Sequence, residues 1–319
     1  MNQLIVSSSP HVRAQDTTQR IMLDVLIALT PAAIAAVIIH GWYALLMIVT
    51  TVAVSVGAEF LFNLCIKKTQ TISDLSAAVT GLILALNLPS TTELWQCAIG
   101  AVFAIVVVKC FFGGIGCNFA NPAATARVFL VLAFAAAGGG AMAGNPLTGG
   151  YVDLVGGATP LPLLGQGAPA SELPTLLEML LGLRGGAIGE GCIIALLIGG
   201  IYLIVKRVIS WEVPTAFIAT VFLLSWLITG DLVSAIYYIF AGGVFIAAFF
   251  MITDYSTTPI NKLGKIVFAV CVGLITILIR FFGSYPEGVS FAILITNIVS
   301  PYIEKLCAKR PFGGVKNEN

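Results

Sequence analysis

The chain has 319 residues, of which 58% are hydrophobic and 10% are charged, and its mean hydropathy is +1.01. Soluble globular proteins are about half apolar and about a quarter charged, so this composition excludes a water-soluble domain and indicates a polytopic integral membrane protein. The net charge of +1 indicates no nucleic-acid partner, and the seven cysteines form no Cys-x-x-Cys pair that would indicate a zinc or iron–sulfur site.

Apolar segments of about 20 residues, the length of helix that crosses a bilayer, recur along the chain. The polar segment 1–20, which precedes them, lacks the apolar core of a cleavable signal peptide. We predict an all-α fold with ten spans: 21–39, 42–66, 72–88, 93–110, 119–137, 188–205, 213–229, 232–252, 265–281 and 287–304. The resulting parts are a tail (1–20), five spans (21–137), a loop (138–187), five more spans (188–304) and a second tail (305–319).

The basic residues set the orientation, because cytoplasmic loops hold most of the lysine and arginine of a membrane protein. In the ten-span arrangement, 13 of the 16 basic residues fall on one side: Arg13, Arg20, Lys67, Lys68, Lys109, Lys206, Arg207, Lys262, Lys265, Lys305, Lys309, Arg310 and Lys316. This distribution predicts that both termini lie in the cytoplasm. We expect the membrane to be the cytoplasmic (inner) membrane. The loop 138–187, rich in glycine and proline, then lies outside the cytoplasm.

Two short patterns occur once in each half of the chain. "SDLSAA" at 73–78 resembles "GDLVSA" at 230–235, and Gly-x-x-Phe-Ala occurs at 116–120 and again at 288–292. In the ten-span arrangement each pattern opens a corresponding span of its half. Because five is an odd number, the two halves have opposite orientations, which is the inverted-repeat organisation of many transporters. Such proteins bind their substrates near the midplane, at the interface of the repeats.

The segment "FFGGIGCNFANPAATAR" predicts a broken helix. Gly113, Gly114 and Gly116 end one helix, and Asn121-Pro122 begins another with proline in its first turn. The free N–H groups at such a helix start attract an anion or a polar ligand. Asn-Pro-Ala also occurs in water channels, but those channels need a second copy and this sequence has none.

Polar side chains within apolar segments are costly and usually face the protein interior or a water-filled cavity. We therefore name a candidate ion pathway: Asp74, Asn121, Asp231, Asp254 and Asn297. For the three aspartates, and for Asp24, capping of a helix end is the alternative role. Glu59 and Arg127 lie deeper in their spans and either bind an ion or cofactor or form buried structural pairs.

Motifs throughout the chain resemble the RnfD/NqrB family. They are "SSSPH" near the start, "SDLSAAVTGLILALNLP", "GGIGCNFANPAATAR", "GGATPL", "MITDYSTTP" and "YPEGVSFAILITN". The resemblance implies a membrane subunit of the Rnf complex, a redox-driven pump that couples electron transfer from ferredoxin to NAD⁺ with movement of Na⁺ or H⁺. It implies the A, B, C, E and G subunits as partners, through which this chain would reach ferredoxin and NAD⁺. The chain itself has no Gly-x-Gly-x-x-Gly fingerprint and no ferredoxin-like cysteine cluster.

The resemblance also implies a covalent cofactor in the loop. The family motif Asp-x-x-(Ser/Thr)-Gly-Ala-Thr holds FMN by a phosphoester on its last threonine, which here is Thr159. Asp153, Gly157 and Ala158 are in register, and Gly156 stands where the family usually has serine or threonine. A flavin transferase outside the cytoplasm would supply FMN from FAD, with release of AMP. The small residues open the backbone to the phosphate, and glycine N–H groups can hold it.

The quinone-reducing relatives imply a second, non-covalent flavin, such as riboflavin, among the spans. Two readings of the sequence compete with the redox pump. Inverted repeats and an Asn-Pro-Ala segment also occur in non-redox channels and transporters, and a chain without its own reaction centre also suits a structural scaffold. Flavin on the purified chain distinguishes the pump subunit from the channel.

Overall fold

The described part of the chain is entirely helical in its regular elements, as predicted. The computed structural model describes residues 17–134, 161, 164, 173–182, 185–283 and 288–308. Within them one isolated antiparallel bridge joins Pro89 to Ala187, and no strand is present. The motif at 153–159, for which we predict a covalent flavin, lies outside the described residues.

Within residues 17–134, the first half contains five helical segments in the order predicted from the sequence. They are α1 (Thr18–His40), α2 (Trp42–Cys65), a 3-10 turn (Ile72–Asp74) leading into α3 (Ser76–Leu86), α4 (Leu94–Val102) continued by a π-helix (Phe103–Cys110), and α5 (Pro122–Ala133). The π-helix lies at the end of α4, and such segments are frequent at functional sites.

The second half follows a short helix, α8 (Leu176–Leu181), and its described residues again form five helical segments. They are α9 (Ile193–Val205), α10 (Glu212–Thr229), α11 (Leu232–Phe240) with α12 (Val244–Ile246) and its π-helical continuation (Ala247–Met251), α13 (Lys262–Phe282), and α14 (Val289–Cys307). A break at 241–243 separates α11 from α12, and the two parts meet at an angle of 64°.

Several helices are shorter than the predicted spans. In the described residues, five helices are long and apolar enough to cross a membrane, namely α1, α2, α10, α13 and α14, and the bent α11–α12 pair makes a sixth. Helix α3 has 11 residues and so is about 16 Å long, against a hydrocarbon core of about 30 Å. It ends at Leu86, and backbone N–H groups of Ile188 and Gly189 donate to the carbonyls of Leu88 and Leu86. The chain therefore unwinds where a second segment satisfies its backbone groups.

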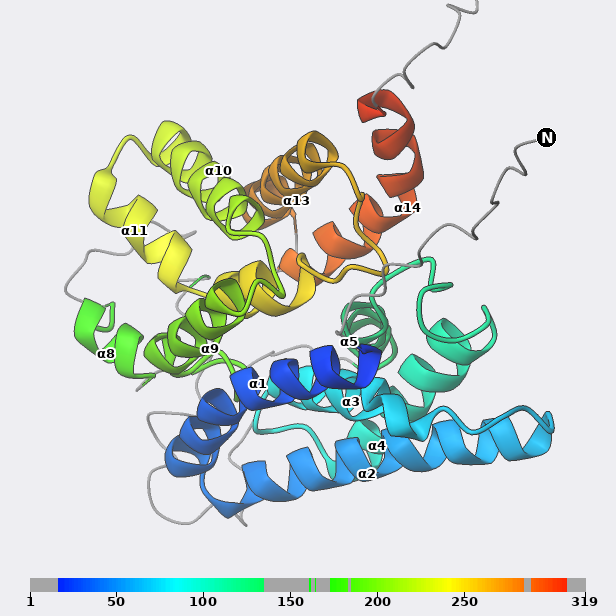
Figure 1. Ribbon diagram of the computed structural model, residues 1–319. Coiled ribbons are helices and arrows are strands. Elements are labelled where there is room, and N and C mark those ends of the chain that lie inside the picture. Colours follow the sequence, from blue (N-terminus) through cyan, green and yellow to red (C-terminus); the bar gives the residue numbers. More distant parts are fainter. Residues whose placement is uncertain are drawn as a thin grey trace, which may run out of the picture.

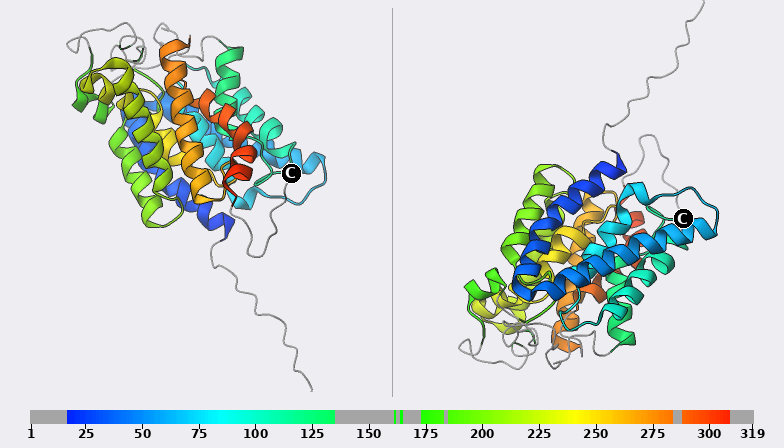
Figure 2. Two further views of the ribbon diagram at one scale, coloured as in Figure 1. Left: turned by 90° about the horizontal axis from the view of Figure 1, so that it is seen from above. Right: turned by 90° about the horizontal axis from the view of Figure 1, so that it is seen from below.

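Corresponding helices of the two halves make corresponding contacts. Helix α2 packs on α3 and α4, as α10 packs on α11 and α13, while α1 packs against α9 and α5 against α14. Figure 1 shows the first-half helices α2–α5 gathered apart from α9–α11, with α1 between them, and the two views of Figure 2 agree. A Cβ on Gly199 would lie 2.0 Å from the carbonyl oxygen of Ala28, so a glycine lets α1 and α9 approach closely.

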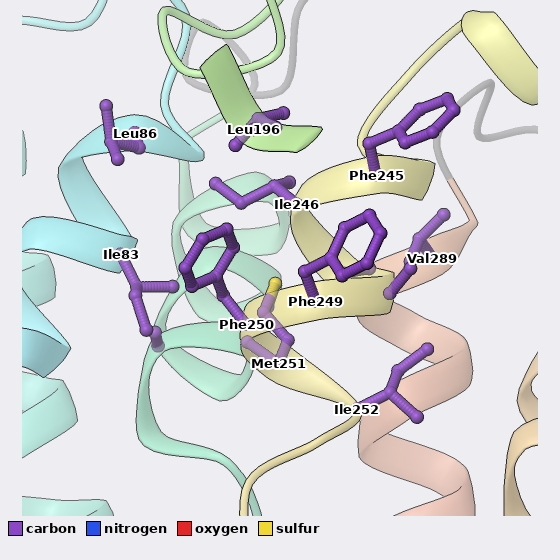
Figure 3. Packing of buried hydrophobic residues seen from close by; sticks show 14 of the residues in the cluster. Ile83, Leu86, Leu196, Phe245, Ile246, Phe249, Phe250, Met251, Ile252 and Val289 are labelled. Atoms are coloured by element: carbon purple, nitrogen blue, oxygen red, sulfur yellow. The ribbon is translucent and has the colours of Figure 1, made fainter. Parts of the chain in front are cut away.

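The broken helix of the second half lies in the centre of the molecule. All residues of α12 and its π-helical continuation are buried. Figure 3 shows Phe250 and Met251 of this segment opposite Ile83 and Leu86 of α3. The core is thus formed where the unwound parts of both halves meet.

Candidate functional site at the interface of the two halves

A cavity of about 90 Å³ lies between the two halves. Helices α1, α3 and α5 line it from the first half, and α9 and the segment 249–256 line it from the second. Its polar lining consists of Ser76, Thr80, Lys109, Asn118, Asn121, Thr253, Asp254, Tyr255 and Ser256. The Oδ1 atom of Asn118 is buried without a hydrogen-bond partner. The cavity lining is mostly apolar, and these polar groups give it a set of oxygen atoms that suits a small hydrated ion.

Asn121 begins α5, as the Asn-Pro pair predicts. Its Oδ1 accepts from the backbone N–H groups of Ala123 (3.1 Å) and Ala124 (3.2 Å), which caps the helix. Its Nδ2 donates to the carbonyl of Met251 (3.3 Å) and so joins the two halves. Gly113, Gly114 and Gly116, which precede the cap, have φ between +84° and +118°, a range that favours glycine, and this confirms the predicted break.

Asn121→Ala is expected to destabilise the protein by about 1 kcal/mol through loss of the cap, with a further loss from the bond to Met251. Asn121→Ser keeps a capping oxygen without the donor that reaches Met251 and should recover the capping part. Thermal unfolding of the detergent-solubilised protein measures both variants. If Asn121→Ala and Asn121→Ser unfold at the wild-type temperature, neither role is correct.

Asp254 faces the cavity from the segment that follows the central broken helix. Its carboxylate accepts from the backbone N–H (3.1 Å) and hydroxyl (2.9 and 3.0 Å) of Ser256 and from the hydroxyl of Thr257 (3.3 Å). Burial raises the pKa of Asp254, and these hydrogen bonds lower it by less. Burial, followed by the charges of Asp254 and Asp74, raises the pKa of Tyr255 to about 12, so both carboxylates act on one hydroxyl.

Asp74 is joined to the cavity through a buried ionic network. Lys109 donates to both oxygens of Glu59 (2.9 and 3.0 Å) and to Ser76 (2.6 Å), and Ser76 donates to Asp74 (2.5 Å). Thr71 donates to Glu59 at 2.7 Å. Lys109 and Glu59 are each only 2% exposed. Glu59 therefore forms the buried pair that was one of its two predicted roles, and Lys109, grouped with the cytoplasmic residues, lies inside the protein.

Arg127 forms a second buried ion pair. Its Nη1 donates to Oδ1 of Asn87 (3.0 Å) and lies 3.5 Å from Oε1 of Glu190. Arg127 belongs to α5, Asn87 follows the end of α3, and Glu190 precedes α9. Sequence reasoning did not single out Glu190, although a lone carboxylate at the start of an apolar span is a signal of this kind.

Two residues of the predicted ion pathway are placed elsewhere. Asp231 is exposed and caps α11, accepting from Val233 (3.3 Å) and from the N–H and hydroxyl of Ser234 (2.9 and 2.8 Å). The bonds from Ser234 lower the pKa of Asp231. Asn297 is buried in α14 with both amide atoms unpartnered, and it is not among the cavity-lining residues. Asn121 and Asp254 thus line one cavity, and Asp74 is bonded to the cavity-lining Ser76. Asp231 and Asn297 do not line it.

Asp153, Gly156, Gly157, Ala158 and Thr159 lie outside the described residues. Leu161, two positions after Thr159, is described and buried in an apolar cluster. The other members of this cluster are Leu164, Leu173, Met179 of α8, and Tyr237, Tyr238 and Ala241 at the end of α11. The chain that leaves the motif is therefore anchored next to the break between α11 and α12.

Comparison with known proteins identifies relatives along the whole chain. It is 44% identical to the D subunit of the Na⁺-translocating ferredoxin:NAD⁺ oxidoreductase complex of Acetobacterium woodii, over 99% of this chain and 98% of that one. It is 39% identical to the D subunit of the proton-translocating ferredoxin:NAD⁺ oxidoreductase complex of Clostridium ljungdahlii, over 98% and 97%. With the D subunit of an ion-translocating oxidoreductase complex of Methanosarcina acetivorans it shares 31% identity over both full chains. Residues 5–313 match the NQR2, RnfD, RnfE family, and the chain belongs to this family.

Proposed function

We propose that this chain is the D subunit of a complex that transfers electrons from ferredoxin to NAD⁺ and uses the energy to translocate Na⁺ or H⁺. The similarity to two such subunits over nearly the whole chain carries this proposal. The names of these two relatives specify different ions, so the identity of the ion stays open between Na⁺ and H⁺. The chain acts as one part of an ion-translocating oxidoreductase and is not catalytic alone.

The proposal includes ten membrane crossings in two inverted repeats, with both termini in the cytoplasm. Its support is the matching order of helices and contacts in the two halves. All four tryptophans are at least 46% exposed, and aromatic residues of this kind gather at the two membrane surfaces. Trp42, Trp95 and Trp226 lie at the extracytoplasmic ends of their helices in this arrangement, and Trp211 lies at a cytoplasmic end.

The proposal also places covalent FMN on Thr159, with Asp153, Gly156, Gly157 and Ala158 around it. Its support is the order of residues in the motif and the anchored Leu161 that follows. The threonine hydroxyl provides the phosphoester oxygen, and the small residues before it leave room for the phosphate. When bound, FMN would supply the electron-carrying chemistry that this chain's side chains lack. A second, non-covalent flavin stays a prediction.

The cavity is the proposed cytoplasmic part of the ion pathway. The carboxylate of Asp254, the hydroxyl groups of Thr253 and Ser256, and the unpartnered oxygen of Asn118 are oxygen ligands suited to Na⁺, and a carboxylate with a raised pKa is suited to H⁺. Asp74 belongs to this pathway because it accepts a hydrogen bond from Ser76, which lines the cavity, and because its charge raises the pKa of Tyr255.

The proposed function is tested in membrane vesicles that contain the complete complex. Reduced ferredoxin should drive NAD⁺ reduction together with uptake of Na⁺ or H⁺, and removal of this chain should abolish both activities until it is supplied again. Undiminished electron transfer and ion uptake without this chain would disprove the proposal. A colourless purified chain, made together with a flavin transferase and conducting a solute in liposomes, would favour the channel.

A further inference from the structure

Three discontinuities of the fold meet at the Arg127–Glu190 ion pair. The first is the end of α3, where Asn87 accepts from Arg127 at 3.0 Å. The second is the segment before α9, which contains Glu190. The third is the α11–α12 break, where a Cβ on Gly243 would lie 2.8 Å from Oε1 of Glu190 and 3.6 Å from Nη1 of Arg127. One buried ion pair therefore connects unwound segments of both halves.

The ion pair lies beyond the cavity-lining residues along both α3 and α5. Arg127 is six residues, or about 9 Å along α5, from the cavity-lining Asn121. Asn87 follows the cavity-lining Ile83 by one helical turn, and its Nδ2 lies 3.5 Å from the sulfur of Met251. The close packing of this region around Ile83 and Met251 is visible in Figure 3.

On its other side, the α11–α12 break adjoins Leu161, the buried residue that follows the predicted flavin motif. Gly242 has φ +69°, and a Cβ there would lie 2.7 Å from Nη2 of Arg280 and 3.1 Å from the Leu161 side chain. Arg280 donates to the carbonyls of Tyr238 (2.6 Å) and Ala241 (3.0 Å), at the end of α11. Two consecutive glycines thus lie between two features of the site. Gly242 adjoins Leu161, which follows the predicted flavin motif, and Gly243 adjoins the Arg127–Glu190 pair.

A fixed arginine in a narrow passage opposes cations electrostatically, and in channels such residues exclude protons and metal ions. A paired carboxylate compensates its desolvation while the passage stays closed. The geometry points to the Arg127–Glu190 pair as the barrier that closes the ion pathway between the cavity and the extracytoplasmic side. This inference rests on the proposed function, because it requires an ion pathway through this chain.

The barrier is tested by passive ion leak through the complete, purified complex in liposomes without an electron donor. The double variant Arg127→Met with Glu190→Gln neutralises the pair. It should raise passive Na⁺ or H⁺ leak by at least about tenfold, equivalent to 1.36 kcal/mol of barrier height. The control, Glu212→Gln with Lys262→Met, neutralises an ion pair of 3.3 Å whose residues do not line the cavity, and it should leak no more than wild type.

Size-exclusion profile and flavin content verify that each complex is assembled. If the Arg127–Glu190 variant fails to assemble, Gly243→Ala takes its place, since its Cβ displaces Glu190. An assembled variant with wild-type leak overturns the inference, and so does an equal leak in both double variants. Failure of the proposed function is recognised separately, because wild-type liposomes would then show no ion uptake when reduced ferredoxin and NAD⁺ are added.

Discussion

Thr159→Ala is expected to remove all covalently bound flavin from the chain and to reduce ferredoxin-dependent NAD⁺ reduction to the level of vesicles that lack this chain. The reason is chemical, since alanine has no oxygen that can form the phosphoester. Flavin fluorescence of the denatured chain on a gel, together with the rate of NAD⁺ reduction in vesicles, measures the two effects. This is the largest functional effect that we expect from any single substitution.

Two control variants test whether the effect depends on the hydroxyl group of Thr159. Thr148→Ala removes another threonine from the same loop and should retain full fluorescence, and Thr159→Ser keeps a hydroxyl and should retain some of it. Full fluorescence in Thr159→Ala would move the attachment point to another residue. Loss of fluorescence with normal electron transfer would leave the tethered flavin without a role and would favour a scaffold.

Lys109→Met is expected to produce the largest loss of stability, about 3–5 kcal/mol, because it leaves the Glu59 charge buried without its partner. Adding Glu59→Gln should recover most of that loss, since neither charge then remains in the interior. The matched control is Lys262→Met, which removes an ion pair with Glu212 at 3.3 Å whose lysine is 86% exposed, and it should change stability by less than about 1 kcal/mol.

Thermal unfolding of the solubilised protein, scored for all three variants, measures these differences. Equal unfolding temperatures for Lys109→Met and Lys262→Met would contradict the buried pair. If the added Glu59→Gln lowered stability further, the loss in Lys109→Met would come from packing of the lysine chain.

Hydropathy and break signals locate a helix in every predicted span because a run of apolar residues, and the residues that end it, are local properties of the sequence. The start of α5 is also readable, since Asn121 caps it with its own side chain. The lengths of α3 and α9 are not readable, because their unwound ends depend on hydrogen bonds between segments about 100 residues apart, such as Gly189 to Leu86. Local hydropathy cannot distinguish a helix that crosses the whole membrane from two shorter segments whose backbone groups form hydrogen bonds with each other.

The prediction of the site is limited for the same reason, because its side chains form ion pairs and hydrogen bonds with residues far away in the sequence. Lys109 reads as a cytoplasmic positive charge until Glu59, 50 residues earlier, is brought within 2.9 Å. Asp74 and Asp231 occupy equivalent places in the repeated pattern, but Asp74 is linked to the cavity whereas Asp231 is an exposed cap. The repeated sequence pattern thus predicts where a helix begins in each half. It does not predict which of the two aspartates is linked to the cavity.

The central claim is the flavin on Thr159, and intact-mass analysis of the purified chain, made together with a flavin transferase, tests it most directly. We expect a mass increment equal to one FMN in phosphoester linkage, located by peptide mapping on the fragment that contains Thr159. An unmodified Thr159 peptide from a complex that reduces NAD⁺ with ferredoxin would contradict it.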